Sequence, residues 1–233
     1  MNQISLKPST IARILGAVAC LLVLASIGGQ LSKYVLWHDI PKRLVRIFDV
    51  DKENNIPTFF SVLLLIFSSL LLAIITLINR KKRTVHVLKW AILSSGFMFL
   101  AYDEAFQVHE KLIKPIRILL GGDNLGVFYY AWVIPGIALV LVLALFFLRF
   151  MLHLPTKTRL SFLVAVILFI GGAIGFELIG GRYAELNGPK NLMYSMIVAI
   201  EESLEMGGLI VFIWALLRYC ADNYKEVRFW FGA

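Results

Sequence analysis

Six apolar stretches, each about as long as a lipid bilayer is thick, constrain this chain more than any other feature of its sequence. A hydrocarbon core of about 30 Å needs about 20 mostly apolar residues in a helix. The mean hydropathy of +0.80 and the 59% share of hydrophobic residues are far above those of ordinary soluble domains. We therefore predict an all-α polytopic membrane protein with six transmembrane helices, at about residues 11–31, 58–78, 87–106, 127–151, 160–179 and 194–217.

The connections between these spans are short. In a chain of 233 residues they leave no room for a separate soluble domain, so we predict a single integral membrane domain, 1–233. After the first span, the sequence IPKRLVRIF at 40–48 places apolar and basic residues on opposite sides of a helix. We expect a short helix here that lies on the membrane surface.

Basic residues gather in alternate connections, which is the positive-inside bias of bacterial-type inner (plasma) membrane proteins. The set comprises Lys7, Arg13, the run RKKR at 80–83, Arg149, Lys157, Arg159, Arg218, Lys225 and Arg228. We therefore predict an inner-membrane protein with both termini cytoplasmic and with outward loops at 32–56, 111–126 and 181–193. Because this placement explains the net charge of +8, the expected partner is the lipid bilayer and not nucleic acid. The sequence leaves a homo-oligomer open.

Ionisable residues interrupt the predicted third, fifth and sixth spans. They belong to the sequences AYDEAFQVHE at 101–110 and AIEESLEM at 199–206, with Glu177 between them. A charge at the bilayer centre costs at least about 2.5–3.5 kcal/mol on insertion scales. Such groups therefore require partners, shared protons, water or a metal ion.

Helical geometry predicts that these side chains converge. In a continuous helix, Asp103, Gln107 and Glu110 share one face. The three glutamates of the last span also share a face, and Glu205 approaches the membrane midplane, whereas we expect Glu177 near the outer surface. We predict one polar chamber that opens outward, with Gln107 as a supporting polar residue. The candidate metal ligands are Asp103, Glu104, His109, Glu110, Glu177, Glu201, Glu202 and Glu205.

The chemistry of this set favours hard or borderline divalent ions over copper or an iron–sulfur cluster, and shared protons are an alternative to a metal. Many carboxylate oxygens with one imidazole suit a hard or borderline divalent ion, namely Mn, Fe, Zn or Mg. The sequence contains no nucleophile elbow, phosphate-binding glycine loop or paired-cysteine motif.

An internal repeat links the two acidic motifs. A shift of 98 residues aligns AYDEAFQV at 101–108 with AIEESLEM at 199–206, and Pro57-Thr58 with Pro155-Thr156. Because three spans separate the copies, we predict a helix-pair repeat in inverted topology, in which the second and third helices correspond to the fifth and sixth. The pair Gly171 and Gly175 is expected to let the fifth helix pack closely on a neighbour.

At DEAFQVHE and EESLEMGG the chain resembles uncharacterised multi-pass bacterial membrane proteins that pair a DExxxxHE helix with a late EExxEM helix. The resemblance covers most of the chain and implies a multi-pass helical fold. It implies no particular activity.

Three interpretations follow for function. The first is a cluster that binds a divalent metal cation and transports it, because transport sites commonly lie between two repeats. The second is a metal-dependent membrane enzyme, either a hydrolase or a di-metal oxidoreductase. The third is a non-catalytic subunit of a membrane complex. The sequence does not decide whether the protein is an enzyme and identifies no catalytic residue.

Overall fold

The computed structural model describes residues 7–36, 41–52, 54–122 and 124–224, and all regular structure in this part of the chain is helical. The predicted basic residues Lys225 and Arg228 lie outside the described residues. The elements are α1 (Pro8–Leu31), the π-helical turn η1 (Ser32–Leu36), α2 (Lys42–Phe48), α3 (Ile56–Lys81), α4 (Val87–Phe106), α5 (Val108–Leu119), the 3-10 turn η2 (Gly126–Phe128), α6 (Val133–His153), α7 (Thr156–Ile170), the π-helical η3 (Gly171–Phe176), α8 (Glu177–Asn187) and α9 (Leu192–Asn223).

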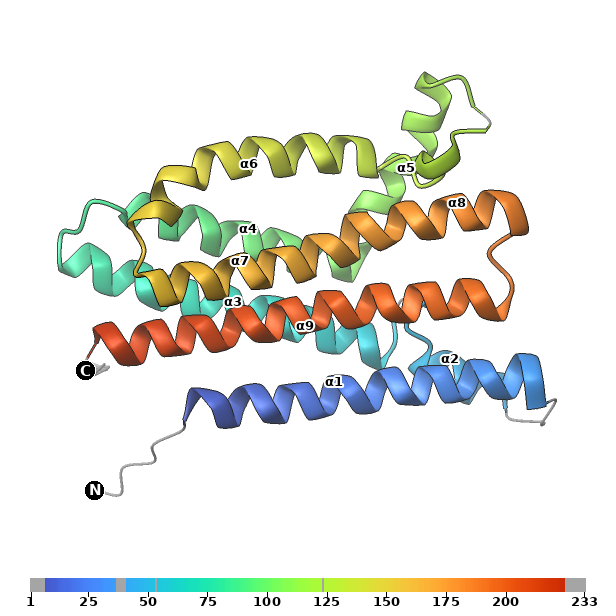
Figure 1. Cartoon of the computed structure of the whole chain (residues 1–233), viewed down its shortest axis with the longest axis horizontal. Helices are drawn as coiled ribbons and strands as arrows, with labels where there is room; N and C mark the ends of the chain where they lie inside the picture. Colours follow the sequence, from blue (N-terminus) through green and yellow to red (C-terminus); the bar gives the residue numbers. More distant parts are fainter. Residues whose placement is uncertain (1–6, 37–40, 53, 123, 225–233) are drawn as a thin grey trace, which may run out of the picture.

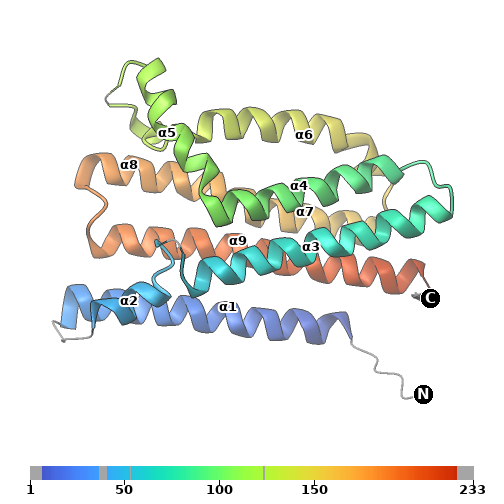
Figure 2. The same cartoon turned by 180° about the vertical axis from the view of Figure 1, so that it is seen from behind.

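The long helices lie side by side in a bundle (Figure 1). The start of α1, the α3–α4 and α6–α7 connections and the end of α9 lie together at the left of Figure 1, which we name the terminal end. The α2 region, α5 and the α8–α9 connection lie at the opposite end, which we name the cavity end (Figures 1 and 2).

Several of these helices have the length and apolar character of membrane spans. In the described part of the chain they are Pro8–Val35, Ile56–Lys81, Val133–His153 and Thr156–Asn187. The fold is therefore that of an all-helical protein with several helices able to cross a membrane. The predicted third and sixth spans also form long helices, α4 and α9, but these carry the acidic motifs and are not among the four.

The fifth helical segment is longer than predicted. Instead of ending near residue 179, it continues through η3 and α8 to Asn187, so most of the expected loop at 181–193 is helix. Gly181, which favours a loop by sequence, packs within this helix: a β-carbon there would lie 3.3 Å from the Cβ of Tyr129. The close contact between α8 and the segment around η2 holds the extra turns in place.

The predicted continuous helix through 101–110 is wrong. Gln107 has a φ of 54° in the left-handed region, which ends α4 and starts α5 in a new direction. Asp103 stabilises this break, because its Oδ1 accepts the backbone N–H of His109 at 2.8 Å. A carboxylate that caps the first turn of α5 satisfies a donor that has no partner within the helix.

Two glycines bring α7 and η3 into backbone contact with α9. A β-carbon at Gly208 would lie 2.7 Å from the backbone N of Phe169, and one at Gly172 would lie 2.8 Å from the backbone O of Glu201. The predicted contact pair is therefore wrong, since a β-carbon at Gly171 or Gly175 would meet no atom within 4 Å. Gly172 follows Ala165 and Phe169 at ordinary helical spacing, so it lies on the face of the helix that meets α9.

Aromatic side chains contribute to the larger hydrophobic core, toward the terminal end of the bundle. Trp90 is fully buried and makes edge-on contacts with Phe150 at 5.0 Å and Phe162 at 6.3 Å between ring centroids. Phe97 stacks on Phe212 at 4.7 Å. This core joins α3, α4, α6, α7 and α9. The acidic residues of the two motifs lie toward the cavity end of the bundle.

The contact at Gly208 gives a testable stability difference between neighbouring glycines. We expect Gly208→Ala to lower the free energy of unfolding by about 1–3 kcal/mol, because an added methyl group forces packed backbones apart. Gly207→Ala is the matched control, because a β-carbon there meets nothing within 4 Å. Thermal unfolding of the two variants in the same detergent measures the difference; equal stabilities would contradict the close contact.

Candidate functional site

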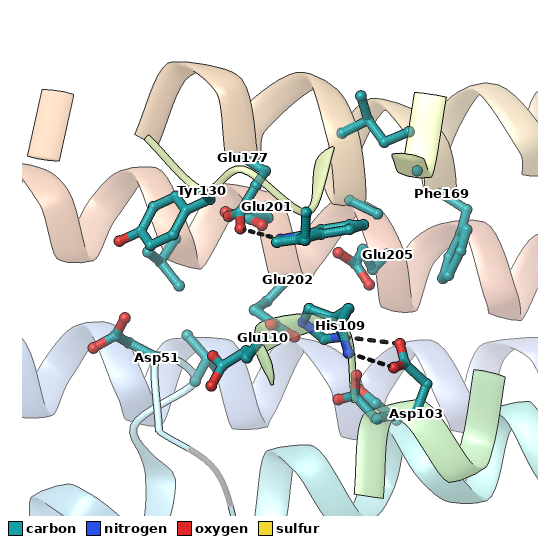
Figure 3. Close-up of a pocket in the computed structure, with 18 of the residues that line it drawn as sticks. Asp51, Asp103, His109, Glu110, Tyr130, Phe169, Glu177, Glu201, Glu202 and Glu205 are labelled. Atoms are coloured by element: carbon teal, nitrogen blue, oxygen red, sulfur yellow. Dashed lines mark hydrogen bonds and ion pairs between the residues drawn. The ribbon is translucent and has the colours of Figure 1, made fainter. Parts of the chain in front are cut away.

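The cavity end contains a cavity of about 450 Å³. It lies between α4 and α5 on one side and α8 and α9 on the other, with α3, α6, α7 and η3 completing the wall. Figure 3 shows Glu177, Glu201 and Glu205 across the cavity from Asp103, His109 and Glu110. All eight candidate residues line it: Asp103, Glu104, His109, Glu110, Glu177, Glu201, Glu202 and Glu205.

Asp103 and His109 form a fixed pair on the α4–α5 side. The Oδ2 of Asp103 lies 2.8 Å from the Nδ1 of His109, in addition to the backbone hydrogen bond at Oδ1. The imidazole also packs against the indole of Trp132, with 4.8 Å between ring centroids. Since Nδ1 is engaged by Asp103, Nε2 is the ring nitrogen left for a ligand or a proton.

The pKa of His109 reflects this pairing. Burial lowers the pKa, but the hydrogen bond and negative charge of Asp103, with the charges of Glu110 and Glu104, outweigh burial and leave the pKa above the ordinary value of histidine. Protonation of His109 therefore stabilises the folded state at low pH. This contribution is lost as the pH rises through the raised pKa.

Glu177 and Glu201 form the second fixed pair, on the α8–α9 side. Their side chains are hydrogen bonded to each other, and the indole Nε1 of Trp132 donates to Oε1 of Glu177 at 2.8 Å. Two carboxyl groups can share a hydrogen bond only when one carries a proton. Glu177 and Glu201 lie at the same depth in the bundle, each about 14–15 Å from the cavity-end tip of its helix, α8 or α9. The extension of the fifth helical segment to Asn187 accounts for this agreement.

The remaining acidic residues extend the cavity along α9 and α4. Glu205 lies one turn beyond Glu201, and Leu209 and Phe169 follow it in the lining. Leu209 belongs to the aromatic core and Phe169 packs against it, so the cavity has a closed apolar floor. Glu110, in contrast, is exposed.

The mouth of the cavity contains residues of both charges. Asp51 and Lys52 form an ion pair there, and Lys190 joins them in the lining. Burial raises the pKa of Asp51 although the ammonium of Lys52 opposes this. Tyr130 and Tyr194 lie at the same end, with 2.6 Å between their hydroxyl oxygens.

The sequence did not predict these further lining residues. Trp132 belongs to no acidic motif, yet its indole N–H donates to Glu177. Asp51 and Lys52 lie in an irregular segment with no recognisable motif, and the buried contact of the Val50 backbone N–H with the Ser26 hydroxyl at 3.1 Å brings them to the cavity. Gln107 was predicted to support the site but is not in the lining, because it forms the break between α4 and α5.

The carboxylates surround the cavity without closing around one point. Within the part of the chain that the structure describes, no group of three or more His, Cys, Asp or Glu side chains is arranged to hold a metal ion as it stands. Occupation by a metal ion therefore requires glutamate side chains to rotate toward a common centre. A glutamate has three side-chain torsions with which to do so.

The Asp103–His109 pair gives a prediction for titration. In protein kept free of metal by a chelator, we expect Asp103→Asn to lower the pKa of His109, because the variant loses the charge that stabilises the imidazolium. NMR titration of histidine-labelled protein measures the midpoint. Glu110→Gln is the matched control and should lower the pKa less, since Glu110 acts only through its charge. A wild-type midpoint below that of Asp103→Asn would contradict the pairing.

Comparisons with known proteins place this fold and cavity in a family. No curated protein and no solved structure matches the chain. One family model, described as "Domain of unknown function (DUF8692)", matches residues 14–220, which include every residue that lines the cavity and therefore all eight candidate residues. The chain therefore belongs to the family of DUF8692 domains.

Proposed function

We propose that this protein crosses the membrane six times and binds a divalent metal cation in its acidic cavity. The observation that carries the proposal is the convergence of His109 and seven carboxyl groups from four helices on one cavity. Carboxylates gathered away from bulk water repel one another and are costly without a compensating positive charge. Of the cations in the lining, Lys52 is already paired with Asp51 at the mouth.

The arrangement of the bundle supports six spans and a common orientation. The helices α1, α3, α4, α6, α7–α8 and α9 alternate in direction between the two ends (Figures 1 and 2). The run 80–83 and the basic residues Arg149, Lys157 and Arg218 lie at or beside helix ends at the terminal end. By the positive-inside rule this end faces the cytoplasm and the cavity opens outward.

The predicted inverted repeat has less structural support than the gathering of the predicted site residues around one cavity. Gln107 ends α4, whereas its counterpart under the 98-residue shift, Glu205, lies inside α9. Both motifs also lie in the cavity half of the bundle, whereas an inverted repeat would place them in opposite halves. The inverted repeat stays a prediction.

The fixed Asp103–His109 pair supports a metal ligand in place of a solvated histidine. Metal-binding histidines usually donate their second ring N–H to a carboxylate, which orients the ring. In this scheme His109 Nε2 and the carboxylates of Glu202 and Glu205 are the ligands, and Asp103 is a positioning residue instead of the direct ligand predicted from the sequence. An oxygen-rich set with one nitrogen ligand suits Mn²⁺, Fe²⁺, Zn²⁺ or Mg²⁺.

Isothermal titration of the purified protein with Mn²⁺ tests the proposal. We expect one-site binding to the wild type, a 10- to 100-fold weaker Kd for Asp103→Asn, which removes a group that orients a ligand, and a larger loss for Glu205→Gln. Asp222→Asn is the matched control, because this exposed carboxylate lies on the same helix far from the cavity. Wild-type affinity in Glu205→Gln, or no binding to the wild type, would refute the site.

The closed floor of the cavity favours catalysis as a second candidate function. Below Leu209 and Phe169 the aromatic core fills the bundle, so an ion has no open path to the terminal end. With His109 Nε2 on the metal, a lining carboxylate that does not bind the metal would act as the general base. A resident metal that activates water beside such a base fits a hydrolase.

Uptake measurements separate the two uses of a bound cation. In proteoliposomes we expect Mn²⁺ to bind in stoichiometric amount without uptake above that of protein-free vesicles, because the core blocks passage. Uptake that is present in the wild type and abolished in Glu205→Gln would instead establish a carrier.

A further inference from the structure

The wall formed by α6 differs from the rest of the bundle. The buried residues of α6 are Val133 and Phe150, one near each end. At the terminal end, Lys89 of α4 donates to the backbone oxygen of Phe146 at 2.9 Å, and Phe150 packs on Trp90. At the cavity end, Trp132 next to α6 holds His109 and Glu177. Between these two attachments the backbone of α6 comes closest to that of η3.

The loosely packed middle of α6 forms one wall of the cavity. Gly136, Leu139 and Val140 line it, opposite Leu100 of α4. Leu139 is nevertheless 55% exposed. A residue that lines the cavity while more than half of its surface is exposed indicates a lateral opening beside α6, where Leu100 of α4 is a neighbouring lining residue. Leu139 lies about 9 Å along α6 from Val133, so this opening faces the hydrocarbon of the membrane when α6 spans it.

The cavity is also larger than a metal ion alone requires. Its volume of about 450 Å³ lies in the range of small-molecule pockets. A water molecule takes up only about 30 Å³ of the liquid, so an ion with a few waters would leave much of the space to another ligand. The lining is mixed, since the carboxylates share it with the apolar side chains of Leu100, Leu139, Val140, Phe169 and Ile170.

A buried hydroxyl in the same lining has no partner. Ser61 of α3 is only 6% exposed, and its Oγ has no hydrogen-bond partner among the described residues. Buried polar atoms in proteins are nearly always satisfied, so an unpartnered hydroxyl beside a cavity indicates a missing ligand or water. The Ser61 hydroxyl can accept a hydrogen bond from a donor group in the acidic part.

We propose that the cavity takes an amphiphile with a long alkyl chain and a cationic amine headgroup, which arrives from the membrane through the opening between α4 and α6. The positive charge of the amine complements the carboxylates, and its N–H groups can donate to the Ser61 hydroxyl. The alkyl chain then contacts the apolar lining residues beside Leu139. This inference rests on the proposed cation-binding function, because the headgroup shares the same acidic cavity with the metal ion.

Thermal unfolding of the detergent-solubilised protein with hexadecylamine tests this proposal. At about 100 times Kd, binding should raise Tm by about 5–10 °C. Hexadecanol, which lacks the charge, and butylamine, which lacks the chain, should raise it much less at equal concentration. Equal shifts with all three compounds, or no shift with hexadecylamine, would overturn the proposal.

Variants on α6 locate the route. Leu139→Trp should fill the opening and abolish the shift with hexadecylamine, and Leu100→Trp should do the same from α4. Leu141→Trp is the matched control and should keep the shift, since Leu141 is 60% exposed on the same helix and does not line the cavity. Loss of the shift in Leu141→Trp as well, or its retention in both Leu139→Trp and Leu100→Trp, would contradict access between α4 and α6.

Mn²⁺ titration of the same proteins separates this proposal from the proposed function. We expect Leu139→Trp to bind Mn²⁺ with the wild-type Kd, because the ligands lie on other helices. Mn²⁺ binding without any response to hexadecylamine would overturn the amphiphile alone. A response to hexadecylamine without Mn²⁺ binding would overturn the metal site and leave the route standing.

Discussion

The cost of a carboxylate in a low-dielectric environment is the constraint on which the rest of this structure depends. An apolar bundle that carries acidic residues on several helices must bring them to one polar space or keep them near water. Here Glu201 and Glu205 project from the middle of α9, and they reach Glu177 only because Gly172 lets η3 approach the backbone of α9. Close contact through small residues is how helices associate in lipid, where burial of apolar surface provides little driving force.

Two hydrogen-bonded pairs of side chains then give the two sides of the cavity different chemical properties. Asp103 holds His109 on one side, and Trp132 and Glu201 hold Glu177 on the other. Within each pair, some donor and acceptor atoms are engaged and others stay available to a ligand, such as Nε2 of His109. Trp132 contacts both pairs, since its ring packs on His109 while its N–H binds Glu177. A substitution of Trp132 would therefore alter the contacts of His109 on one side of the cavity and of Glu177 on the other.

Tight and loose packing are separated in the bundle. The contacts of α9 with α1, α3 and α7 and the aromatic core at the terminal end form a rigid frame, whereas α6 is attached mainly near its ends. This closely packed frame fixes the backbones from which the cavity carboxylates project. The weakly packed α6 forms a wall of the same cavity, and it is through this wall that we propose an amphiphile enters.

The sequence by itself determined the all-helical class, the identity of the eight acidic and histidine residues and their shared location, because helix periodicity and the cost of charge in lipid are local properties. It also predicted the short helix after α1, which α2 confirms. Tertiary structure alone decided the break at Gln107, the extension of the fifth helical segment to Asn187 and the contact through Gly172 instead of Gly171. Those features depend on which neighbour a backbone meets, as when Asp103 caps His109 or Tyr129 packs against Gly181, and no spacing within one helix carries that information.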